Sequence, residues 1–134
     1  MRRREKGTST VIFAFVAPLL LLILFATMEA GRVFSAWLVI TNEAREAARY
    51  GAVNHGGPEG TEASIQSFAI NRLRGQLDTS AESLYKPPYV DVDPTGKPQV
   101  DVTIYYQVRL VIPLVSTVLP NPFKLTARSV MRGE

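Results

Sequence analysis

The chain lacks most of the side chains from which enzyme and metal sites are built. None of its 134 residues is a cysteine, and His55 is its only histidine. The lack of cysteine excludes disulfides, thiolate zinc sites and cysteine nucleophiles, and a single imidazole excludes sites that need two. No Gly-x-Ser-x-Gly motif, Ser-x-x-Lys motif or phosphate-binding glycine-rich loop is present. We therefore expect no enzyme activity, no catalytic residue, no bound metal and no cofactor.

Net positive charge is missing from all but one end of the chain. The formal net charge is +3, and residues 1–7 alone, with four bases and one acid, account for it. The other 127 residues carry eleven charges of each sign. A nucleic-acid-binding domain is expected to carry its positive charge as a face or stripe on its folded part, so nucleic acid is not an expected partner. A basic tip is typical of the cytoplasmic flank of a membrane helix.

One long run of the sequence contains no charge at all. Residues Thr8–Met28 are 21 uncharged and mostly apolar residues that follow the basic tip directly. As a helix they would be about 30 Å long, which matches the hydrocarbon core of a bilayer. A cleavable secretory signal is the competing reading, but its apolar core would be shorter and a polar mature start would follow. We favour a retained membrane helix with its N-terminus in the cytoplasm.

The helical pattern continues beyond the apolar run and predicts one helix from about Thr8 to Tyr50. Pro18 lies inside it and is expected to bend it modestly, as membrane helices tolerate. Gly51 and the turn residues 54–58 are expected to end it. Small residues four apart permit close helix packing, and they mark a candidate contact face for a partner: Ala44, Ala47, Ala48 and Gly51.

Two charged residues follow the charge-free run. Glu29 and Arg32 are three residues apart and can pair along one helix face. They are either a solvated pair at the membrane boundary or a partner contact in which a partly desolvated Glu29 meets a cation on a neighbouring protein. With Gly31 between them, they complete the candidate helix-packing and partner-contact residues.

The rest of the chain predicts a second helix and about three strands. Thr61 is a candidate N-cap for an amphipathic helix over about residues 62–78. After Pro87 and Pro88 the pattern changes to alternation, with strands over 89–93, 99–110 and 123–132. One face of the middle strand is apolar throughout: Val100, Val102, Ile104, Tyr106, Val108 and Leu110. Together these elements predict an α+β fold, a long N-terminal helix with a small antiparallel sheet.

The predicted organisation has four parts. Residues 1–7 form a basic cytoplasmic leader, 8–29 a transmembrane helix, 30–51 its extension outside the membrane, and 52–134 a small α+β outer domain. Because one helix and three strands make a thin core, the extension is expected to complete it. The apolar connection 111–122 either covers this core or exposes a patch to a partner or to lipid.

Two remaining features are better explained by loops than by chemistry. Asp91, Asp93, Thr95 and Gly96 have the spacing of a calcium loop, but Val102 occupies the position where that loop needs a bidentate glutamate. A hairpin turn accounts for these residues without metal. His55 lies in a glycine-rich bend and is expected to be an exposed loop residue.

The residues now described resemble the TadE-like proteins, minor pseudopilins of tight-adherence pili in the type IV pilus superfamily. The resemblance is carried by the basic tip with Gly7, the step Met28-Glu-Ala-Gly-Arg-Val-Phe34, the segment Thr41-Asn-Glu-Ala-Arg-Glu-Ala-Ala-Arg-Tyr-Gly51 and the C-terminal strand. It implies a single-pass protein of the bacterial cytoplasmic membrane, with its C-terminal domain outside, which helps to assemble or prime a filament. Its implied partners are membrane lipid, other pilus subunits and a prepilin peptidase.

The resemblance also implies a cleavage site between Gly7 and Thr8. Pilin-like proteins usually have glutamate five residues after the cut, whereas this chain has Ile12. Both a processed pseudopilin and an unprocessed anchor therefore stay open. The alternative function is a single-pass accessory or scaffold subunit of a larger integral-membrane complex.

Overall fold

The computed structural model describes residues 2–77, 83–93, 99–112, 117 and 119–132. In chain order the elements are helix α1 (Arg2–Val53), a short 3₁₀ turn η1 (Pro58–Gly60), helix α2 (Glu62–Arg74) and strands β1 (Tyr89–Asp93), β2 (Gln99–Val108) and β3 (Phe123–Arg132). The predicted α+β fold, with one long helix, one further helix and a three-stranded sheet, is confirmed.

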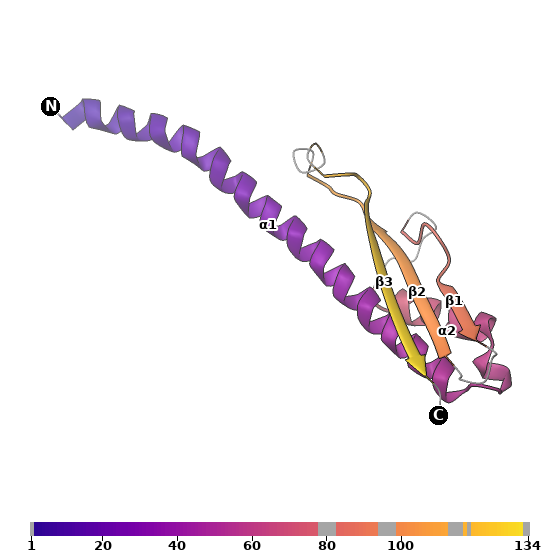
Figure 1. The fold of residues 1–134 in the computed structure, drawn as a ribbon. Coiled ribbons are helices and arrows are strands. Elements are labelled where there is room, and N and C mark those ends of the chain that lie inside the picture. The colour runs from indigo at the N-terminus through magenta and orange to yellow at the C-terminus, as the bar shows by residue number, and fades with distance from the viewer. Residues whose placement is uncertain (1, 78–82, 94–98, 113–116, 118, 133–134) are drawn as a thin grey trace.

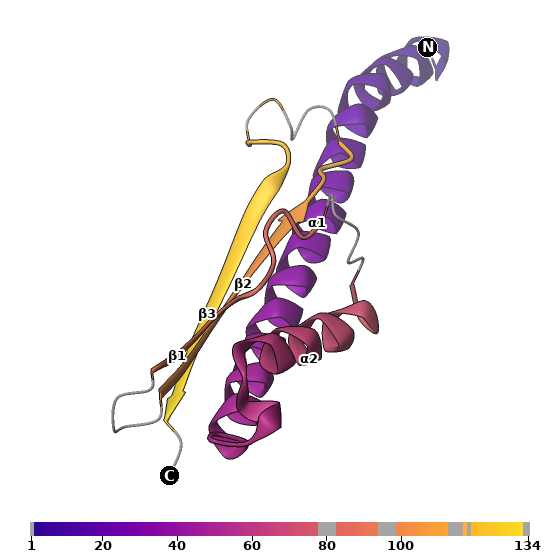
Figure 2. The same ribbon diagram turned by 90° about the vertical axis from the view of Figure 1, so that its right-hand side faces the viewer.

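The elements form two layers and one long projection. The strands make an antiparallel sheet in the order β1-β2-β3, and the C-terminal half of α1 lies along one face of it (Figure 1). Helix α2 crosses beside α1 on the same side of the sheet, so both helices cover one face (Figure 2). The N-terminal half of α1 extends away from the domain (Figure 1).

Helix α1 is longer at both ends than the sequence predicts. It includes Pro18 without ending, and Figure 1 shows its N-terminal part gently curved. It also continues through Gly51 to Val53, after which the Asn54 side chain bonds the carbonyl of Tyr50 at 2.9 Å. Gly51 does not end the helix, and its small size instead allows α1 to pack closely against Ile65 of α2. An added Cβ there would lie 2.6 Å from the Cδ1 atom of Ile65.

Helix α2 begins where the sequence predicts and ends earlier. The Thr61 hydroxyl accepts a hydrogen bond from the Ser64 amide at 3.4 Å, so the predicted N-cap is confirmed. The helix ends at Arg74, and the Gly75 amide bonds the carbonyl of Arg72 at 3.3 Å. The expected end near residue 78 was therefore wrong by about one turn, because the apolar stripe continues beyond the helical backbone.

The three strands follow the predicted alternation. Strand β1 pairs with β2 from Tyr89–Thr103 onward, and β2 pairs with β3 as far as Val108–Phe123. The residue pairing is unbroken along both pairs of strands. Strand β2 ends at Val108, two residues before the predicted end, although Leu110 is still buried. The side chain of Asn121 bonds both backbone groups of Leu110, at 3.2 and 3.3 Å, and thereby closes the connection between β2 and β3.

The extension of α1 completes the core, as expected. Its inner face carries mostly small buried residues, which bring the helix close to the sheet and to α2: Ala36, Ile40, Ala44, Ala47 and Ala48. They meet Ile65, Ala69 and Leu73 of α2 and the inner face of the sheet. The core is thus built jointly by α1, α2 and the sheet.

The connection between β2 and β3 does not simply cover this core. Val111 is 69% exposed and Leu119 is 42% exposed, whereas Leu110 is buried. The predicted turn after Asp93, with Thr95 and Gly96, lies outside the described residues.

Candidate functional site

The most conspicuous surface of the molecule is the N-terminal half of α1. Every large apolar side chain from Val11 to Met28 is exposed, and none of this segment packs inside the domain. In the part of the chain that the structure describes, α1 is the one helix long and apolar enough to cross a membrane, by length and composition. Exposed apolar surface on this scale marks a contact with lipid or protein. The residues of the predicted cleavage, Gly7 and Thr8, lie within the same helix.

Glu29 and Arg32 lie where the exposed half of α1 meets the domain. The Nη1 atom of Arg32 is 3.2 Å from the Oε1 atom of Glu29, so the two side chains pair within the chain. The Glu29 side chain is only 5% exposed, whereas that of Arg32 is 55% exposed. The carboxylate is therefore desolvated and compensated by its own neighbour, and the arginine keeps free surface toward solvent or a partner.

The other predicted contact residues separate into two groups. Ala44, Ala47, Ala48 and Gly51 are buried against this chain's own sheet and α2. Gly31 is exposed, and a Cβ added to it would have nothing within 4 Å. A glycine in a helix interior costs about 1 kcal/mol relative to alanine. Within the part of the domain that the structure describes, neither close packing nor a positive φ requires glycine at position 31.

Gly31 belongs to a shallow surface on one flank of α1. Met28, Gly31, Arg32 and Ser35 line one side of the helix together with side chains of β2. Met28, Gly31 and Ser35 recur at helical spacing and are all exposed. This flank, which we call the Gly31 flank, offers a close approach to the helix backbone beside the half-exposed Arg32.

The opposite flank of α1 borders an apolar groove of about 480 Å³. One wall is α1, with Ala26, Ala30 and Trp37. The other includes Leu119 from the connection and Phe123 at the start of β3. Trp37 stacks on Phe34 with ring centroids 5.9 Å apart. We call this the Trp37 groove.

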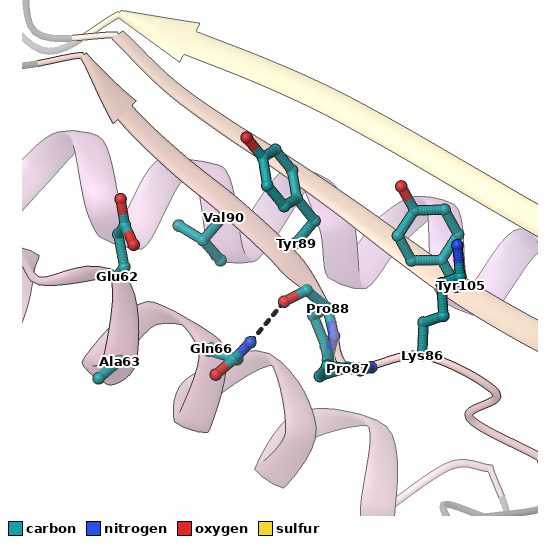
Figure 3. A pocket seen from close by; sticks show the side chains of 9 residues that line it. All are labelled: Glu62, Ala63, Gln66, Lys86, Pro87, Pro88, Tyr89, Val90 and Tyr105. Atoms are coloured by element: carbon teal, nitrogen blue, oxygen red, sulfur yellow. Dashed lines mark hydrogen bonds between the residues drawn. The ribbon is translucent and has the colours of Figure 1, made fainter.

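A third hollow, of about 540 Å³, lies between α2 and β1 (Figure 3). The Gln66 amide donates a hydrogen bond to the Pro88 carbonyl at 2.6 Å and fixes the two walls. Lys86 lies over the Tyr105 ring, 5.5 Å from its centroid. Within the described residues no three His, Asp or Glu side chains gather as a metal site, and His55 is exposed in its loop.

Sequence reasoning missed the polar contact that fixes α2 on α1. Glu43 is buried, and its two oxygens accept from the Nε atom of Arg72 at 3.0 Å and the amide of Gln76 at 2.6 Å. The available signal was its spacing, since Glu43 recurs with Ala36, Ile40 and Ala47 on the inner face of α1. A carboxylate in such a row needs a partner from another element.

Two further contacts shift proton affinities at the domain surface. Packing of the Tyr50 ring against Phe68, with centroids 4.2 Å apart, and its hydrogen bond to Glu59 raise the pKa of the phenol. Hydrogen bonds and charge attraction from Asp101 raise the pKa of Arg128 on the open face of the sheet. Both contacts hold charged and aromatic side chains in fixed positions on the surface of the domain.

Comparison with known families supports the resemblance seen in the sequence. The sequence model of the TadE-like protein family matches residues 7–49. Searches of curated proteins and of solved structures found no match. The matched segment coincides with α1 from the predicted cleavage site to the domain core, and it includes Glu29, Gly31 and Arg32. Over residues 7–49, helix α1 is therefore similar to the TadE-like protein family.

Proposed function

We propose that this chain is a TadE-like pseudopilin or assembly component of a tight-adherence pilus. In this proposal α1 anchors the protein in the bacterial cytoplasmic membrane with its N-terminus inside and the α+β domain outside. The observation that carries the proposal is the family match to residues 7–49, a segment whose apolar half has no partner within the domain. The basic tip supports the orientation, because positive flanks stay in the cytoplasm.

The proposal assigns contact with other subunits to the Gly31 flank. Ala44, Ala47, Ala48 and Gly51 use their small size within this chain, so the exposed surface of α1 is left for neighbours. Gly31 allows a neighbouring helix to approach the backbone, and Arg32 offers a cation at its edge. The function is thus packing and assembly, and it needs no catalytic group.

The absence of cysteine allows a clean crosslinking test of this contact. Ser35→Cys places a thiol on the Gly31 flank, and Ser67→Cys places one on the exposed surface of α2 as the matched control. In cells that make pili, we expect a photocrosslinker attached to the thiol of the Ser35→Cys variant, and not one attached to the Ser67→Cys variant, to join the protein to pilus-assembly proteins. Absence of such products, with normal piliation after deletion of the gene, would refute the proposal. Co-purification with another membrane complex would then favour the accessory-subunit alternative.

Processing by a prepilin peptidase is a separate part of the proposal. The intact mass of the protein from its native membrane distinguishes a chain that begins at Thr8 from one that retains residues 1–7. We expect the shorter chain for a pseudopilin. Retention of the leader would contradict processing, and would leave a permanent anchor that acts by the same helix contacts.

A further inference from the structure

We infer that the Trp37 groove holds an acyl chain of a phospholipid from the outer leaflet. The inference rests on the proposed membrane anchoring, and it assigns the groove an occupant of its own. The groove begins at Ala26, within the charge-free run, and extends along α1 to Trp37, about 16 Å farther at 1.5 Å per residue. In the proposed anchoring, its lower end is therefore at the level of the acyl chains, and its upper end lies beyond them, on the headgroup side.

The groove continues the lipid-facing surface of α1. Ala26 and Ala30 are on the same helix as the exposed apolar residues of the span, with no charged side chain between them other than the buried Glu29. In Figure 1 the ends of β2 and β3 that carry the groove's second wall point toward the N-terminal half of α1. A lipid packed against the span thus meets the open groove directly.

The lining is suited to a hydrocarbon occupant. Among the described residues that line the groove, Glu29 is the one ionisable side chain, and Arg32 already compensates its charge. Water gains little in an apolar hollow that offers few hydrogen bonds. Trp37, an aromatic residue suited to the interface between hydrocarbon and headgroups, stands at the upper end. An acyl chain in the groove shields the apolar side chains of both walls from water, and it needs no hydrogen-bond partner.

Trp37 is the only tryptophan of the chain and is therefore a built-in probe of its own groove. The full chain would be reconstituted in vesicles of phosphatidylethanolamine and phosphatidylglycerol whose acyl chains carry bromine both near the ester group and at mid-chain, so that the quencher reaches the upper end of the groove as well as the span. Bromine quenches tryptophan fluorescence on contact. We expect Trp37 to lose most of its fluorescence relative to the same vesicles without bromine.

Two variants separate a chain in the groove from general proximity to the membrane. Ala30→Leu fills the groove, and we expect it to restore most of the lost fluorescence. Ser35→Leu adds the same side chain on the opposite flank and is expected to restore none. Equal quenching in all three proteins would overturn the inference, because filling the groove would then have displaced nothing.

Two other quenching patterns would overturn the inference, and each would indicate a different occupant of the groove. Quenching by aqueous iodide and not by brominated chains would mean that water fills the groove. Protection of Trp37 from both quenchers, lost when the protein is diluted in lipid, would mean that a second copy of the chain covers the groove.

A tryptophan placed at Leu22 in a Trp37→Phe background reports on the contact between the span and lipid. If that residue is quenched and Trp37 is not, only the groove inference fails; if neither is quenched, membrane anchoring fails with it.

Discussion

We predict that the Glu43–Arg72 contact stabilises the packing of α2 on α1. Its contribution to the free energy of unfolding can be measured directly. The Glu43 side chain is 5% exposed and that of Arg72 is 50% exposed, with 3.0 Å between the Nε and Oε2 atoms. Gln76 donates to the second oxygen at 2.6 Å. Both carboxylate oxygens are therefore satisfied, and removal of either donor leaves a buried acceptor poorly paired.

The expected magnitude follows from this geometry. A hydrogen bond to a charged group contributes about 1.5–3 kcal/mol, so Glu43→Gln should lower the free energy of unfolding by about 2 kcal/mol. Arg72→Gln should cost less, about 1 kcal/mol, because half of the guanidinium is exposed and water can replace part of the contact. The double variant should lose less than the sum, with a coupling energy of about 1 kcal/mol.

The assay is urea unfolding of the full chain in detergent, followed by far-ultraviolet circular dichroism. The matched control is the Glu46–Arg49 pair on the same helix, which is 3.9 Å apart with side chains 43% and 69% exposed. Neutralising that pair should give a coupling near zero, as exposed pairs do. Strictly additive effects of Glu43→Gln and Arg72→Gln would refute the argument that this contact fixes α2.

Three further outcomes follow from the packing. Gly51→Val should lower the free energy of unfolding by about 1–3 kcal/mol, because its Cβ would lie 2.6 Å from Ile65, and urea unfolding measures the loss. Gly31→Ala should not destabilise the chain in the same assay, since its Cβ meets nothing; a loss would show a hidden contact. The raised pKa of Tyr50 means that its stabilising contribution is complete below its ordinary value of 10.0 and is lost as pH rises through the folded pKa. Tyr50→Phe should therefore lessen the fall of stability above about pH 10, and an unchanged alkaline profile would contradict the assignment.

Much of the fold could be predicted because its signals are local. The charge-free run, the alternation of Val100 to Val108 and the N-cap Thr61 each depend on neighbours within a few residues. Those elements appear where the sequence places them. The small residues of α1 also indicated close packing.

What packs against what could not be predicted in the same way. The spacing of Ala44, Ala47 and Ala48 is equally compatible with another subunit and with this chain's own sheet. Only the tertiary arrangement, with Ile65 and Val100 close to Gly51, shows which surface they cover. The pairing of Glu43 could not be predicted from its neighbours in sequence, because its partner Arg72 is 29 residues away. Contacts of this kind arise from the docking of elements, which local patterns do not encode.

In the proposed anchoring, the same helix would be both the membrane anchor and a part of the core, and this has a mechanical consequence. Helix α1 is continuous from Arg2 to Val53, so no flexible linker separates the exposed apolar half from the domain. Glu29 lies at the junction, buried and paired with Arg32. Sliding α1 along its axis relative to the sheet would pull this carboxylate from its cover and break the packing of Ile40 and Gly51 together. The domain is therefore expected to tilt and rotate together with the exposed half of α1 as one body. If α1 is the proposed anchor, a force on it would reach the sheet through a continuous helix and not through a flexible linker.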